Sequence, residues 1–226
     1  ENGTRRVLDA CKKTEVAARH FAPTTGYGYD DVGRDTLGKI FAELFGTEAA
    51  IVRPHIASGT HAISLCLFGL LLPQDHVLSV TGRPYDTLTD IIGIGDGAAP
   101  VGSLKEMGVS YSDVPLTEDG RIDVEAVERA IRPNTKVVMA QRSCGYAWRP
   151  SLMPEDFAPL AAMLHEKHPE ITLMVDNCYG EFVCDKEPTH YGADVCVGSL
   201  IKNPGGGLAP TGGYIVGNAA AVTRIA

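Results

Sequence analysis

Short, nearly continuous apolar segments recur along the chain, separated by polar or glycine-rich residues. Runs of Val, Ile, Leu and Met of this length are typical of parallel strands that are buried on both faces by helices. They predict strands over His76–Val80, Val109–Val114, Lys136–Gln141, Ile171–Asp176, Asp194–Ser199 and Gly213–Val216. A shorter extended segment is predicted at Ala49–Val52.

Between and before these segments, the apolar residues follow a helical spacing. We predict helices over Arg5–Phe21, Asp35–Phe45, Gly59–Leu72, Asp86–Ile92, Asp123–Ile131 and Pro154–Lys167. Asp35 is the expected N-cap of the second helix, and Gly46 is its expected C-terminal stop. The alternation favours an α/β fold with one open, mostly parallel sheet and helices on both faces. In such sheets, ligands bind beyond the carboxyl ends of the strands.

Composition narrows the class of protein further. The chain has 226 residues and a formal net charge of −8, without a cluster of Lys or Arg, so nucleic-acid binding is not expected. No apolar run approaches the roughly 20 residues of a membrane-spanning helix, and residues 1–13 do not resemble a signal peptide. The six cysteines contain no Cys-x-x-Cys pair. We therefore expect a cytoplasmic protein with reduced thiols rather than a disulfide framework or a zinc site.

The segment Ser58-Gly59-Thr60 directly precedes the most apolar predicted helix. A helix N-terminus offers unpaired N–H groups and the positive end of the helix dipole, which together favour a phosphate. Gly59 allows close backbone approach, and the flanking hydroxyls can add donors. The alternative is a plain Ser N-cap, which these three residues alone favour.

Asp176 closes the apolar strand that begins at Ile171. A carboxylate at the end of a buried strand is costly unless it meets a cation or hydrogen-bond donors. A protonated pyridine nitrogen is one such cation. The alternative is a capping or turn Asp that leads into Asn177.

Lys202 follows the strand Asp194–Ser199 and precedes a run of glycines, which leaves room for a bulky group beside it. Burial among apolar neighbours favours the uncharged amine that a Schiff base requires. Tyr85 follows the strand His76–Val80 and could stack on a planar ring. The alternatives are a solvated surface Lys and a core or rim Tyr. Each of these features is weak evidence for a site when taken alone. Their order along the chain is more informative: the helix start comes first, then the aromatic residue, the strand-end Asp and the Lys.

That order resembles fold-type-I enzymes of pyridoxal 5'-phosphate (PLP), and the surrounding motifs are similar to the aluminium-resistance or methionine gamma-lyase-like family. The resemblance extends over essentially the whole chain and is carried by residues 24–31, 142–150, 175–182 and 198–213. It implies an N-terminal helical segment and subunit-interface loop at residues 1–45 and a PLP-binding large domain at residues 46–226. We expect a C-terminal small domain, absent from these residues, to supply the arginine for the substrate carboxylate.

The resemblance also implies a role for each matching residue. Lys202 would carry PLP as a Schiff base and move the α-proton, Asp176 would pair with the pyridinium nitrogen, and Tyr85 would stack on the ring. The remaining cofactor-binding residues would be Ser58, Gly59, Thr60, Asn177, Tyr179 and Ser199. Tyr29 matches a tyrosine that reaches the phosphate from the neighbouring subunit, but Asp31 stands where an arginine is usual, with Arg34 as a substitute. Arg142 is a candidate for facing the substrate.

The resemblance implies a PLP-dependent carbon–sulfur lyase that would perform β- or γ-elimination on a sulfur-containing amino acid. A homodimer or homotetramer with active sites shared between subunits is expected. The open alternatives are another PLP reaction, transamination or aldol cleavage, and a non-catalytic role in metal tolerance. No metal site is expected, because the histidines are scattered and Asp30-Asp31 alone do not form a coordination shell.

Overall fold

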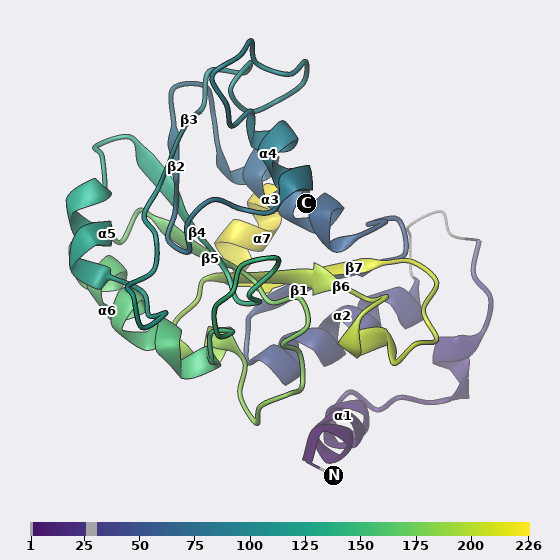
Figure 1. Cartoon of the computed structure of the whole chain (residues 1–226). Coiled ribbons are helices and arrows are strands. Elements are labelled where there is room, and N and C mark those ends of the chain that lie inside the picture. Colours follow the sequence, from purple (N-terminus) through teal and green to yellow (C-terminus); the bar gives the residue numbers. More distant parts are fainter. Residues whose placement is uncertain (1, 26–30) are drawn as a thin grey trace.

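A seven-stranded mixed sheet with the strand order β1-β7-β6-β5-β4-β2-β3 forms the centre of the protein (Figure 1). The structure is a computed structural model, and it describes residues 2–25 and 31–226. Neighbouring strands from β3 across to β6 run parallel, whereas β7 is antiparallel to both β6 and β1. The strands are β1 Ala49–Arg53, β2 His76–Ser79, β3 Ser110–Asp113, β4 Thr135–Gln141, β5 Thr172–Asp176, β6 Val195–Ser199 and β7 Gly213–Gly217. The predicted mostly parallel α/β sheet is confirmed.

Helices cover both faces of this sheet (Figure 1). They are α1 Asn2–Lys13, α2 Val32–Phe45, α3 Gly59–Leu70, α4 Asp86–Ile92, α5 Val124–Ala130, α6 Ala158–Lys167 and α7 Ala219–Ile225. Side chains on a strand alternate between the two faces. Leu173 and Val175 of β5 therefore join the core under α2, α5 and α6, while Met174 joins the core under α3, α4 and α7. This double burial explains why the central strands β5, β6 and β7 are largely apolar without alternation, whereas the edge strand β3 is more polar.

The N-terminal part of the chain differs from the prediction. The helix expected over Arg5–Phe21 ends at Lys13, where the Thr14 hydroxyl bonds back to the Ala10 carbonyl and Glu15 takes a left-handed backbone conformation. A short 3-10 helix, Ala18–Phe21, follows.

The N-cap of α2 also differs, because its cap is Asp31 rather than Asp35. The Asp31 side chain accepts a hydrogen bond from the Arg34 N–H at 3.0 Å, and the helix starts at Val32. The predicted stop at Gly46 is confirmed by its left-handed backbone. At the predicted helix Pro154–Lys167, the first residues form a 3-10 turn, Pro154–Phe157, before α6.

Aromatic side chains join α2 to the sheet. The ring of Phe45 lies 6.0 Å from that of Phe41 and 5.2 Å from that of Tyr214 on β7, centroid to centroid. These residues belong to one buried cluster. The domain division at residues 45 and 46 stays a prediction. Among the described residues, no helix combines the length and the apolar character that crossing a membrane requires.

Replacing Phe45 by Ala should lower the free energy of unfolding by about 3–5 kcal/mol, because a fully buried aromatic ring leaves a cavity. Urea unfolding of the full-length protein measures this difference. Phe21→Ala is the matched control: Phe21 is 80% exposed, so a change within about 0.5 kcal/mol is expected. Equal losses in the two variants would contradict the packing described for α2.

Candidate cofactor site

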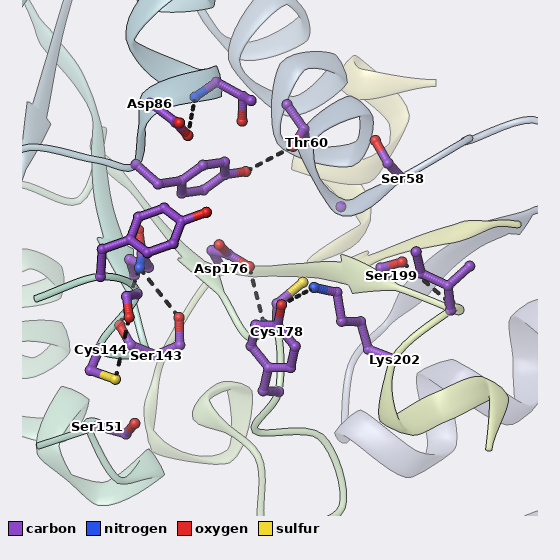
Figure 2. Close-up of a pocket in the computed structure, with 18 residues that line it drawn as sticks. Ser58, Thr60, Asp86, Ser143, Cys144, Ser151, Asp176, Cys178, Ser199 and Lys202 are labelled. Atoms are coloured by element: carbon purple, nitrogen blue, oxygen red, sulfur yellow. Dashed lines mark hydrogen bonds between the residues drawn. The ribbon is translucent and has the colours of Figure 1, made fainter. Parts of the chain in front are cut away.

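A pocket of about 670 Å³ lies where the carboxyl ends of the parallel strands meet the start of α3 (Figure 2). Strand β5 contributes Asp176, and Lys202 follows β6. Among the residues predicted for the site, those that line this pocket are Ser58, Gly59, Thr60, Tyr85, Asp176, Tyr179, Ser199 and Lys202. Asn177 does not line it, and Tyr29 lies outside the described residues.

The start of α3 forms one end of the pocket. The Ser58 hydroxyl accepts a hydrogen bond from the His61 N–H at 3.1 Å, so Ser58 acts as the N-cap. A Cβ on Gly59 would lie only 3.0 Å from the sulfur of Cys178, so glycine lets the helix start approach the loop after β5 closely. The N–H groups of a first helical turn have no acceptor within the helix. This end therefore suits a phosphate group.

Two hydroxyl-bearing side chains flank the helix start. The Thr60 hydroxyl and the Tyr85 phenol are 3.1 Å apart and share a hydrogen bond. Ser199, the last residue of β6, is buried, and its hydroxyl accepts from the Ile201 N–H at 3.3 Å. Burial raises the pKa of the Tyr85 phenol above its ordinary value, which already keeps a tyrosine protonated at neutral pH.

Asp176 is a buried carboxylate in the wall of the pocket, only 6% exposed. One of its oxygens accepts a hydrogen bond from the Cys178 N–H at 3.1 Å. Burial raises the pKa of Asp176, while the Cys178 N–H and the charge of Lys202 act in the opposite direction. A carboxylate in this environment is stabilised by a cation placed in the pocket.

Lys202, labelled in Figure 2, and Tyr179 both line the pocket and contact each other. The Lys202 amine contacts the Tyr179 phenol oxygen and lies 3.7 Å from the centroid of its ring. Tyr179 has a left-handed backbone with a φ of 66°. The Asn203 side-chain amide donates to the Tyr179 carbonyl at 2.9 Å and to the Glu181 carbonyl at 3.0 Å. The loops after β5 and β6 are thereby tied together, which sets where the Lys202 side chain begins.

Asn177 and Arg142 lie behind the pocket instead of lining it. Arg142 is 3% exposed, and its guanidinium donates to the Asn177 side-chain oxygen at 2.8 Å and to the Gly180 carbonyl at 2.7 Å. The Asn177 amide donates to Glu187 at 3.0 Å, and Arg142 pairs with the same carboxylate at 3.8 Å. The expectation that Arg142 faces the substrate is therefore wrong, because its donors are used to hold the loop after β5. The Asn177 side chain is likewise not brought into the pocket.

Several pocket residues were not singled out from the sequence. Gln141 ends β4, and its amide donates to the Ser143 carbonyl at 3.2 Å. The Arg149 guanidinium donates to the carbonyls of Gln141 and Ser143, which folds this loop back on its own base. Other residues in the pocket wall include Cys144, Tyr146, Ser151 and Cys178. Gln141 could have been found from its place at a strand end, the usual ligand-binding edge of such a sheet.

A lysine and a buried carboxylate face one pocket, beside a helix N-terminus and a tyrosine whose ring could stack on a planar group. On this α/β sheet, these features fit the class of fold-type-I PLP-binding domains that the sequence resembles. The family model described as methionine gamma-lyase matches residues 1–226 of this chain. The chain belongs to this family, which is one of PLP-dependent carbon–sulfur lyases.

Individual relatives agree with this membership. The uncharacterised protein YnbB of Bacillus subtilis is 54% identical over 219 residues, which cover 97% of this chain and 52% of YnbB. The L-methionine gamma-lyase of Pseudomonas putida is 30% identical over 215 residues, which cover 93% of this chain and 48% of that enzyme.

Solved structures are similar over nearly the whole chain. A carbon–sulfur lyase involved in aluminium resistance from Clostridium novyi NT has a TM-score of 0.94 at 44% identity, over 99% of this chain and 53% of that one. A Bacillus cereus protein has a TM-score of 0.94 at 54% identity, over 100% and 55%. The chain thus spans about half the length of the relatives it matches.

Replacing Arg142 by Met should lower the free energy of unfolding by about 3–5 kcal/mol, because Glu187 would remain buried without its closest cation. Chemical unfolding of the full-length protein tests this. In the control Arg121→Met, the lost partner Asp119 is largely exposed, so the expected change is within about 1 kcal/mol. A neutral Arg142→Met variant would show that the buried network does not hold the pocket loops.

Proposed function

We propose that this protein is a PLP-dependent carbon–sulfur lyase that eliminates a thiol or sulfide from a sulfur-containing amino acid. The observation that carries the proposal is the buried Asp176 carboxylate, which shares one pocket with the Lys202 amine. Membership of the methionine gamma-lyase family supports the reaction type. The fold alone would not, since one PLP fold hosts several chemistries.

The residues of the pocket fit PLP at each end. The N–H groups at Gly59 and Thr60, with the Ser199 hydroxyl, suit the phosphate, and the buried Asp176 suits the protonated ring nitrogen. Tyr85 provides an aromatic face in the same pocket. When bound, PLP would act as an electron sink for the carbanion formed at the substrate α-carbon.

Three side chains of the pocket have separate proposed roles in the reaction. Lys202 would hold the cofactor through its amine, and this amine, when free, would take the proton from the α-carbon of the substrate. Asp176 would keep the ring nitrogen protonated. Tyr85 is a neutral phenol at neutral pH, and burial raises its pKa further, so it can donate a hydrogen bond to the departing sulfur.

The proposal includes a homo-oligomer in which the pocket is completed by a second subunit. Tyr29 supports this, because it matches a tyrosine that reaches the phosphate from the neighbouring subunit in the family that the sequence resembles. Tyr29 itself lies outside the described residues. A small amino acid is the proposed substrate, and L-methionine and L-cysteine are the first compounds to test. Sedimentation of the full-length protein measures the oligomeric state, and a monomer with full activity would overturn this part.

Lys202→Ala should abolish the visible absorption band of lysine-bound PLP together with the release of thiol or sulfide. The reason is that no other amine lines the pocket among the described residues. Absorbance and keto-acid assays of the full-length protein measure both effects. Lys39→Ala, an exposed position on α2, is the control. If the wild type forms a keto acid only when a second keto acid is added, transamination replaces the proposed elimination.

Asp176→Asn should keep the lysine-bound cofactor but lower kcat by on the order of 10²-fold, because a neutral amide no longer stabilises a protonated ring nitrogen. Steady-state kinetics with saturating PLP measure the change. Asp90→Asn, on the exposed side of α4, keeps the same chemical change outside the pocket. An unaltered kcat in Asp176→Asn would contradict the orientation proposed for the ring.

A further inference from the structure

Glu181 is a buried acid that the proposed mechanism does not use. It lies in the loop that follows Asp176, the last residue of β5, and it is 1% exposed. One carboxyl oxygen accepts a hydrogen bond from the Tyr214 hydroxyl at 2.9 Å. Within the described part of the chain, the other oxygen, Oε2, has no hydrogen-bond partner. A buried carboxyl group with a free oxygen is far less costly when it is neutral than when it is ionised.

The Glu181 carboxyl lies directly behind the strand that leads to Lys202. A Cβ on Gly198 of β6 would lie 2.4 Å from the Glu181 carboxyl oxygen and 2.5 Å from the Tyr214 hydroxyl oxygen, so only glycine leaves this space. Side chains alternate along a strand. Ser199 therefore faces the pocket, while the face of Gly198 is occupied by Glu181.

The backbone of Glu181 belongs to the same assembly. Its carbonyl accepts from the side chain of Asn203, the residue that follows Lys202. Glu181 is therefore linked to both strand ends that form the cofactor site. The chain connects it to the end of β5, and the hydrogen bond from Asn203 to its carbonyl connects it to the segment after β6.

The groups that face Glu181 are mostly acidic. The titratable ones are Asp176, Cys178, Glu187, Cys196 and Tyr214. The nearby cation Arg142 is engaged by Glu187 and by the loop carbonyls, and Arg6 also lies 4.0 Å from Glu187. Burial, with smaller contributions from Asp176 and Glu187, raises the pKa of Glu181 to about 7, although the Tyr214 hydroxyl acts in the opposite direction.

We propose that Glu181 is a positioning residue that works as a neutral acid and tunes the cofactor end of the pocket. While it is protonated, Asp176 can stay ionised opposite the ring nitrogen without a second charge close behind it. When Glu181 loses its proton, the added negative charge favours the protonated forms of the ring nitrogen and of the nitrogen of Lys202. This role rests on the proposed function.

The test is a pH titration of the visible absorption band in full-length protein loaded with PLP. The wild type should show an inflection near pH 7 that is missing in Glu181→Gln. Tyr214→Phe removes the hydrogen bond that favours the ionised form, so its inflection should move to higher pH. A group that serves only packing would not produce shifts with these signs. The Tyr214→Phe variant retains the Glu181 carboxyl group, so it tests the proposal even if Glu181→Gln does not fold.

A second readout does not depend on the cofactor. The folded-state pKa of about 7 lies above the ordinary value of 4.5, so the stabilisation by the bound proton is complete below pH 4.5 and is lost as the pH rises through 7. Between these values, the urea midpoint of the wild type should fall with pH more steeply than that of Glu181→Gln. Glu170→Gln, which removes an exposed carboxylate, is the control.

The outcomes separate the two proposals. If the wild type forms no lysine-bound band with PLP, the proposed function fails, and this role fails with it. If the band forms but the wild type, Glu181→Gln and Tyr214→Phe titrate alike, the role of Glu181 is overturned while the proposed function stands. Equal pH dependence of the urea midpoints in wild type and Glu181→Gln would also overturn it, because Glu181 would then not carry the proton.

Discussion

The burial of the Asp176 carboxylate at the end of β5 is the constraint on which the rest of the site depends. A charge in this position is unfavourable unless donors or cations surround it. The protein supplies the Cys178 N–H directly and the Lys202 charge from the segment that follows β6. On its remaining side, the carboxylate faces the pocket. A bound ring with a protonated nitrogen would place a cation there, so the burial of Asp176 favours a cationic ligand.

This arrangement requires a rigid loop after β5, and a second buried layer provides it. Arg142 donates to the Asn177 side chain and to the Gly180 carbonyl. The Glu187 carboxylate accepts a hydrogen bond from Asn177 and forms an ion pair with Arg142. None of these groups lines the pocket, yet they fix the direction in which the loop leaves the strand. Polar residues next to a ligand pocket can thus have a structural role, because a buried network stabilises the fold only when its members are hydrogen-bonded.

Much of the fold could be predicted from local pattern. The strand positions, the helix Asp86–Ile92 and the stop at Gly46 follow from apolar runs and from residues with special backbone preferences. The errors occurred where competing local bonds decide the outcome. The helix expected through Phe21 ends at Lys13, and Asp31 caps α2 although Asp35 had the same chemical ability. The spacing of apolar residues does not show which of two nearby aspartates caps a helix.

The sequence by itself determined the succession of strands and helices along the chain, the Asp that ends one strand, the Lys that follows another, and the glycine at the start of α3. These follow from periodicity and from residue chemistry, which act over short distances along the chain. Only the tertiary structure decided that Asn177 and Arg142 turn away from the pocket and that Glu181 is buried behind it. The reason is that the direction of a side chain in a loop depends on backbone angles, such as the left-handed Tyr179, and on partners from distant strands.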